Sequence, residues 1–105
     1  MGLETTGIAD QSGAALYILY DGSMRQEQQW RAFADQVRAR CPHQVEVLSI
    51  RDRDGDRVRQ FYSFMPSQLP IVCIIRDNDE LVHIWEGNAN VQVDHVCAML
   101  QQVSG

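Results

Sequence analysis

Cysteine, histidine and serine are the residue types in this sequence that could supply a nucleophile, a general base or a metal ligand. The chain has three cysteines, Cys41, Cys73 and Cys97. No two of them have the spacing of a redox pair or of a metal knuckle. Each falls within an apolar pattern, which favours a small buried hydrophobic residue over a reactive thiol. We therefore expect no catalytic cysteine.

The histidines and the acidic residues form no recognisable metal-binding pattern. The histidines fall on three separate predicted elements, with no cysteine or carboxylate at ligand spacing: His43, His83 and His95. The segment Asp52–Asp56 (D-R-D-G-D) resembles the beginning of a calcium loop. Such a loop requires glycine at its sixth position and glutamate at its twelfth, where this chain has Arg57 and Ser63. The sequence predicts neither a metal nor another cofactor.

The charge of the chain argues against a nucleic-acid partner. The net charge is −5, whereas phosphate binding is driven by clustered basic residues. Four arginines do cluster between Arg51 and Arg59, but Asp52, Asp54 and Asp56 are interleaved with them. This alternation favours a solvated, self-neutralising face.

Length and hydropathy predict one soluble domain. The 105 residues suffice for a single domain, which we place at residues 14–105. No apolar run approaches the roughly 20 residues of a membrane-spanning helix, so we expect no membrane partner. Residues 1–13 are small, polar and without period, which predicts a flexible tail. They also lack the features of a secretory signal, so we expect a cytoplasmic protein.

Two elements should position the first polar cluster of the chain. Residues 14–20 (A-A-L-Y-I-L-Y) predict a buried strand, which Asp21 and Gly22 end. Ser23 then suits a helix N-cap, with Gln26 as a weaker partner in a capping box. One apolar helical face follows, up to the helix-breaking Pro42: Trp30, Phe33, Ala34, Val37 and Cys41.

The middle of the chain predicts a strand, a polar loop and a second helix. Residues 45–50 (V-E-V-L-S-I) read as the strand, and Arg51–Asp56 as the loop. The helix should extend to about Phe64, with a common apolar face: Val58, Phe61 and Tyr62. Met65 and Pro66 end it, because a residue before proline avoids helical backbone.

A β-hairpin occupies residues 69–87 and a final helix follows it. Residues 71–75 form an uninterrupted apolar run after Pro70, as in a strand that is covered on both faces. Asp77–Asp79 provides the turn, and the second strand covers residues 81–85. Asn88 or Asn90 is expected to cap the last helix, which has a continuous stripe: Val93, Val96, Cys97, Leu100 and Val103. The predicted order is β-α-β-α-β-β-α.

This order, and the segment L-P-I-V-C-I-I-R-D-N-D-E-L-V-H-I-W-E-G, resemble the thioredoxin family. The resemblance implies a three-layer α/β/α sandwich with a mixed central sheet and a C-terminal antiparallel hairpin. It also implies a cis peptide bond between Leu69 and Pro70. In that family the cis-proline loop faces the start of the first helix, and an extended peptide or glutathione can add alongside it. Carried over, the binding residues would be Asp21, Gly22, Ser23 and Met24 opposite Leu69 and Pro70, with Trp30 at the edge of the groove.

The sequence departs from thioredoxins at the start of the first helix. Thioredoxins have C-x-x-C there, where the helix N-terminus stabilises a thiolate. Here the stretch reads S-M-R-Q-E and contains no cysteine. Because no neighbouring base activates Ser23, capping of the helix is its expected role. Dithiol exchange at this position is excluded.

The sequence is compatible with two main classes of function and with a third, less specific class. The first is a non-catalytic thioredoxin-like binding module, a chaperone or adaptor, whose partner is another protein or an extended peptide. The alternative is a glutathione-binding enzyme of glutaredoxin or glutathione-transferase type, with Ser23 in place of the catalytic thiol. The third is a structural subunit that self-associates, for example as a homodimer.

Overall fold

The computed structural model describes residues 14–41, 43–86 and 91–104. Its strands are β1 (Ala14–Tyr20), β2 (Gln44–Ser49), β3 (Ile71–Arg76) and β4 (Leu81–Glu86). Its helices are α2 (Met24–Arg40), α3 (Arg53–Phe61) and α4 (Val93–Ser104), with the short 3₁₀ helix η1 (Pro66–Gln68) before β3. The element order agrees with the prediction from sequence. The predicted N-terminal tail, Pro42, Gly87 and both predicted asparagine caps lie outside the described residues.

The strands form one mixed sheet in the order β2-β1-β3-β4. β1 and β2 are parallel, and Tyr20 lies opposite Ser49 in their register. β3 runs antiparallel to β1, with Leu19 opposite Ile71, and is also antiparallel to β4. The hairpin therefore adds antiparallel strands to a parallel pair, as expected from the sequence.

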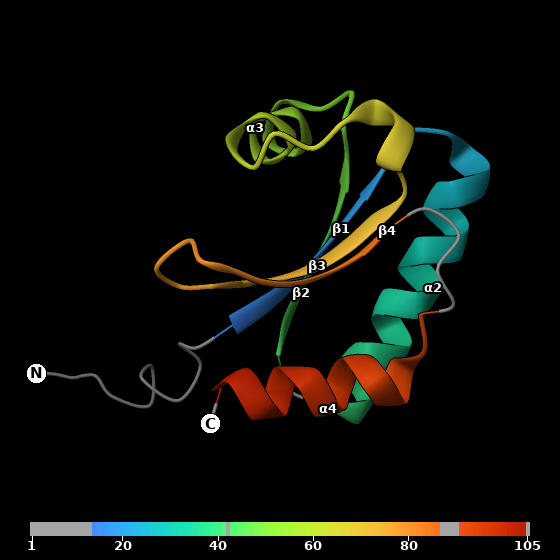
Figure 1. The fold of residues 1–105 in the computed structure, drawn as a ribbon. Helices are drawn as coiled ribbons and strands as arrows, with labels where there is room; N and C mark the ends of the chain where they lie inside the picture. Colours follow the sequence, from blue (N-terminus) through green and yellow to red (C-terminus); the bar gives the residue numbers. More distant parts are fainter. Residues whose placement is uncertain (1–13, 42, 87–90, 105) are drawn as a thin grey trace, which may run out of the picture.

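Helices cover both faces of the sheet, with α2 and α4 on one face and α3 on the other (Figure 1). Successive side chains of a strand point to opposite faces, so β1 contributes to two cores. Leu16 and Ile18 face α2 and α4, where Val37 and Leu100 are also fully buried. The core on the α3 face is smaller and contains Leu19, Phe64, Ile71, Cys73 and Ile75.

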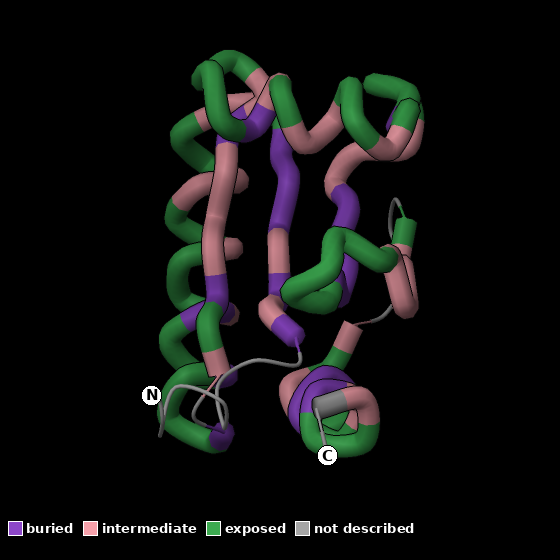
Figure 2. The backbone as a smooth tube through the Cα atoms, turned by 90° about the vertical axis from the view of Figure 1, so that its left-hand side faces the viewer, coloured by how far each residue is buried: buried purple, intermediate pink, exposed green. Residues whose placement is uncertain are grey.

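β3 is the most deeply buried strand, because it lies inside the sheet and both of its faces are covered. Residues 71–75 are all buried, and only Arg76 is exposed (Figure 2). This confirms the interpretation of the apolar run after Pro70. Charged side chains also connect the helices over one face, since Arg40 of α2 pairs with Asp94 of α4.

The second helix begins earlier than predicted, and part of the expected polar loop belongs to it. α3 starts at Arg53, with Asp52 as its N-cap residue in extended backbone. The backbone N–H of Asp56 donates to the carbonyl of Asp52 at 2.9 Å. Asp54 and Asp56 lie in the first turn, where negative charge is favourable next to the positive end of the helix. The acidic residues that suggested a loop are therefore a helix-start signal.

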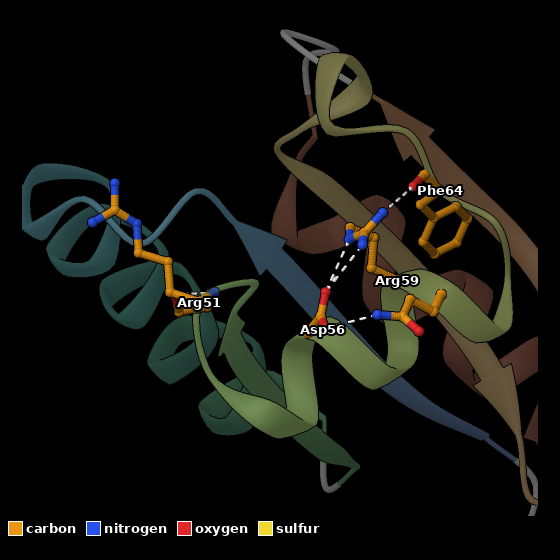
Figure 3. A network of polar contacts seen from close by, with 6 residues as sticks. Arg51, Asp56, Arg59 and Phe64 are labelled. Atoms are coloured by element: carbon orange, nitrogen blue, oxygen red, sulfur yellow. Dashed lines mark hydrogen bonds and ion pairs between the residues drawn. The ribbon is translucent and has the colours of Figure 1, made fainter.

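α3 also ends earlier than predicted, at Phe61. Ser63 follows with φ +58, and Phe64 lies beyond the helix with only 5% of its surface exposed. Val58 and Tyr62 pack against the core, but Phe61 is 66% exposed, so its assignment to the apolar face was wrong. Arg59 holds the helix end, because it pairs with Asp56 at 3.0 Å and donates to the carbonyl of Phe64 at 3.3 Å (Figure 3).

Gly55 allows the first turn of α3 to approach the end of β2. A Cβ atom at this position would lie 2.0 Å from the carbonyl oxygen of Ser49 and 3.2 Å from the nitrogen of Ile50. Both atoms belong to the backbone and cannot rotate away. Only glycine therefore fits between α3 and β2 at this contact.

Replacement of Gly55 by alanine should consequently destabilise the fold, although alanine is the better helix former. We expect a loss of about 2–4 kcal/mol in the free energy of unfolding, measured by urea denaturation. Arg57→Ala, an exposed position in the same helix, is the control and should change it by less than about 0.5 kcal/mol. Unchanged stability of Gly55→Ala would contradict the close contact.

All three cysteines are free and buried. Burial raises the pKa of the Cys73 thiol to about 12. Burial, with a further contribution from the neighbouring Cys97 thiol, raises the pKa of Cys41 to about 12. Raised values favour the neutral thiol, which is the unreactive form.

The thiols of Cys41 and Cys73 should accordingly resist a thiol reagent such as DTNB at pH 8. With a pKa of about 12, about one thiol in 10,000 is ionised at pH 8, against about a quarter for an ordinary thiol. Cys41 and Cys73 should react only when the protein unfolds, so that guanidinium accelerates labelling by orders of magnitude. Rapid labelling of either residue in the native protein, located by mass spectrometry, would contradict this assignment.

Candidate functional site

The candidate site lies at one end of the sheet, where β1 ends and β3 begins. Because Leu19 lies opposite Ile71, the residues that follow β1 and those that precede β3 meet at this end. Figure 1 shows η1 and the first turn of α2 there. The structure thus brings the segment 21–24 and the pair Leu69–Pro70 to the same end of the sheet.

The β1–α2 loop is held by its own hydrogen bonds. The N–H of Ser23 donates to Oδ1 of Asp21 at 2.9 Å, and the N–H of Gln26 donates to Oγ of Ser23 at 3.3 Å. Ser23 is thus the N-cap of α2. The hydrogen bonds from Ser23 lower the pKa of Asp21, so this carboxylate is a weak base. Gly22 between them has φ +93, a conformation that favours glycine.

Arg51 lies against this loop, and the analysis of the sequence did not identify it as a site residue. Its Nε donates to the carbonyl of Asp21 at 3.1 Å, and its N–H donates to Oγ of Ser49 at 3.0 Å. A Cβ atom on Gly22 would lie 2.7 Å from Cδ of Arg51. The position of Arg51 directly after β2 could have indicated its role, because the parallel strands β1 and β2 end at the same edge of the sheet.

The η1 segment supports the other side of the site. The N–H of Met65 donates to Oε1 of Gln68 at 2.6 Å, and Nε2 of Gln68 donates to Oε2 of Glu86 at 2.8 Å. Gln68 thereby links η1 to the end of β4. The peptide bond between Leu69 and Pro70 is cis, and both residues are half-buried.

Two methionines expose most of their surface at this end of the molecule. Met24, the first residue of α2, is 75% exposed, and Met65, the N-cap residue of η1, is 60% exposed. Met65 is a further residue that the sequence analysis did not include in the site. A methionine side chain is apolar and flexible, and so adapts to varied partner surfaces.

Trp30 lies farther along α2 than the other proposed site residues. Its ring is partly buried, packs against the core between the sheet and α2, and makes an edge-to-face contact with Phe33 at 5.6 Å. Seven residues of helix separate it from Ser23, which corresponds to about 10 Å. A role for Trp30 in binding remains a prediction.

The groups at this site suit binding more than bond formation. The stretch 21–27 contains no cysteine. Oγ of Ser23 accepts the capping hydrogen bond, and the neighbouring Asp21 has a lowered pKa, so neither is prepared for nucleophilic attack. Cys41 lies at the opposite end of the 17-residue α2, about 25 Å away along the helix axis.

No group of three or more histidine, cysteine, aspartate or glutamate side chains is arranged to hold a metal ion within the described part of the chain. No helix among these residues has both the length and the apolar character needed to cross a membrane.

Comparison with known proteins finds similarity in structure only. No family model matches the sequence, and no curated protein matches it significantly. Among solved structures, thioredoxin O2 from Arabidopsis thaliana in the oxidised state has a TM-score of 0.62 at 10% identity, covering 91% of this chain and 79% of that one. A designed protein has a TM-score of 0.64 at 9% identity, covering 93% of this chain and 82% of that one.

A third similar structure is part of a longer protein. Human ERp44 in its zinc-bound form has a TM-score of 0.62 at 14% identity, and the match covers 93% of this chain but 29% of that one. Identities this low establish the fold and nothing finer. The chain has a thioredoxin-like fold.

Proposed function

We propose that this protein is a non-catalytic thioredoxin-like module that binds an extended segment of another protein. The binding site is the groove between the β1–α2 loop, Asp21–Met24, and the Leu69–Pro70 loop. One observation carries the proposal. Met24 and Met65 expose 75% and 60% of their surface beside a helix start that has no thiol.

The exposed methionines supply an apolar centre for an interface. Leaving a large apolar side chain in water forgoes about 1.5–3 kcal/mol of burial free energy for each residue, which binding of a partner recovers. Both methionines stand at the first residue or cap of a helix at the same end of the sheet. Such a grouping of exposed apolar residues is typical of a protein interaction surface.

Polar and charged groups lie at the same end of the sheet as the two methionines. Asp21 and Arg51 lie on one side, and Gln68 with Glu86 lies on the other. An apolar centre within a polar rim is the usual composition of a protein interface. The rim charges nearly cancel, so apolar contact and hydrogen bonds, more than net charge, select the partner.

The binding role of the methionines is tested with a peptide selected from a random phage-displayed library on the intact protein. Met24→Ser combined with Met65→Ser should weaken binding of this peptide at least about tenfold, because two buried apolar contacts are lost. Gln101→Ser, at an exposed position of α4 outside both proposed surfaces, is the control. Equal weakening by the control, or none in the double variant, would refute the proposed site.

A second test separates the capping role of Ser23 from a catalytic role. Ser23→Ala should lower the free energy of unfolding by about 1 kcal/mol, and Ser23→Asp should restore most of it, because aspartate also caps helices. Neither the unmodified protein nor the variants should accelerate insulin reduction by dithiothreitol. Ser23 would take part in catalysis if the unmodified protein accelerated insulin reduction, Ser23→Ala abolished this acceleration, and Ser23→Asp did not restore it.

A glutathione-dependent enzyme is the second candidate, and the position of Arg51 favours it. Its guanidinium lies beside the β1–α2 loop and offers a cation to a glutathione carboxylate. Calorimetric titration with reduced glutathione separates the candidates. If the protein is a binding module, it should show no saturable binding of glutathione up to about 5 mM. A dissociation constant of about 5 mM corresponds to a binding free energy of only about −3 kcal/mol. Tighter binding that Arg51→Gln weakens would favour the enzyme instead.

A further inference from the structure

The sheet face under α3 is only partly covered. α3 has 9 residues, whereas α2 and α4 on the opposite face have 17 and 12. Figure 1 shows α3 over the end of the sheet where β1 and β2 finish, which leaves the other end of this face without a helix. Tyr17 of β1 belongs to this face, because it alternates with residues of the other core.

Two adjoining cavities form a groove around Tyr17. The first has a volume of about 240 Å³ and is lined by Tyr17, Arg57, Val58, Phe61, Tyr62, Ile75 and Asp79. The second has a volume of about 270 Å³ and is lined by Tyr17, Gln44, Glu46, Leu48, Asp54, Arg57 and Val58. They share three lining residues, so they form one groove from the edge strand β2 across β1 to the β3–β4 turn. We call it the Tyr17 groove.

The aromatic wall of the Tyr17 groove is held in place before any ligand binds. The hydroxyl of Tyr62 donates to the carbonyl of Asp79 at 2.8 Å, which ties α3 to the β3–β4 turn. The Tyr62 ring stacks on Phe64 at 5.7 Å and meets the edge of Phe61 at 4.8 Å. Phe61 itself remains 66% exposed at the rim. A ligand therefore finds rigid apolar walls and an accessible aromatic ring.

The charges that line the Tyr17 groove are mostly negative. The lining residues of the two cavities include three carboxylates, Glu46, Asp54 and Asp79, and one cation, Arg57. An adjoining cavity beside Tyr17 adds one charge of each sign, Arg76 and Asp77. Burial raises the pKa of the Tyr17 hydroxyl, and the carboxylates of Glu46 and Asp79 raise it further. Burial and Asp79 act in the same direction on Tyr62. The aromatic wall therefore lies in a negative potential.

We propose that the Tyr17 groove binds an extended segment of a partner protein in which a lysine or arginine adjoins an apolar residue. The basic side chain pairs with the carboxylates and lies against the aromatic rings, which attract cations through their faces. The apolar neighbour packs on Val58 and Ile75. The elongated, open shape fits a chain segment, and the negative lining repels nucleic acid and acidic peptides.

This binding surface is separate from the site proposed above. The lining residues of the Tyr17 groove include none of the residues 21–24, 69 and 70. Each surface also has its own exposed apolar residues, Phe61 here and the pair Met24 and Met65 there.

The experiment is a titration of the full ¹⁵N-labelled chain, followed by amide chemical shifts at low salt, with two blocked tripeptides. Ac-Leu-Arg-Leu-NH₂ should shift the amides of Tyr17, Tyr62 and Asp79 with a dissociation constant at least about fivefold below that of Ac-Leu-Glu-Leu-NH₂. Equal affinity for both peptides, shifts centred on Met24 and Met65, or no shifts at about 10 mM peptide would each overturn the proposal.

Variants then test the contacts one at a time. Phe61→Ser and Asp79→Asn should each raise the dissociation constant of the arginine peptide at least about threefold. Asparagine tolerates the backbone of Asp79, which has φ +69, so this variant should keep the fold. Gln101→Ser, at an exposed position of α4 outside both proposed surfaces, is the control and should bind as the unmodified protein does. Unchanged affinity in both groove variants, with unaltered thermal midpoints, would refute the assignment.

Discussion

The antiparallel pairing of β1 with the buried strand β3 is the interaction on which both proposed binding surfaces depend. Leu19 lies opposite Ile71, which puts the β1–α2 loop and the Leu69–Pro70 loop at the same end of the sheet. Tyr17 lies opposite Cys73 in the same register and so reaches the middle of the α3 face. A shift of one residue in this register would turn every side chain of β1 to the other face. One pairing thus positions a loop site and a groove on separate parts of the molecule.

Close backbone contacts fix the loops around that pairing. Gly55 lets α3 lie on the end of β2, and Gly22 lets the side chain of Arg51 cross the β1–α2 loop. In both places the missing Cβ makes room for residues at the end of β2 or directly after it. The two contacts hold the β1–α2 loop, the end of β2 and the first turn of α3 together. They explain why Arg51 serves the loop site while the nearby Asp56 and Arg59 stabilise α3 (Figure 3).

The cysteine thiols are buried, and the Ser23 hydroxyl is engaged in a hydrogen bond. The buried thiols of Cys41 and Cys73 have strongly raised pKa values, and Ser23 is occupied by the cap of α2. Large apolar side chains are instead left exposed, at Met24 and Met65 around one site and at Phe61 on the rim of the other. The thioredoxin-like fold thus combines three buried cysteine thiols with two exposed methionine side chains, Met24 and Met65.

The amino-acid sequence by itself determined the elements and their order. Alternating and continuous apolar runs specify β1 and β3, and the capping serine specifies the start of α2, because these signals depend on near neighbours in the chain. The exposure of Phe61 was missed. The early start of α3 was also missed, because Asp52–Asp56 is compatible with either a polar loop or an acidic first helical turn. Only the contact of Gly55 with Ser49 decides between them.

Tertiary structure alone decided which residues meet. Arg51 reaches Asp21 across 30 residues of sequence, and Tyr62 reaches Asp79 across 17. Met65, before η1, lies at the same end of the sheet as Met24, the first residue of α2. No local pattern encodes these contacts, because they depend on strand register and on the close approach of loops that are distant in sequence. Local periodicity determined which segments are strands and helices, and packing determined the surfaces that they form.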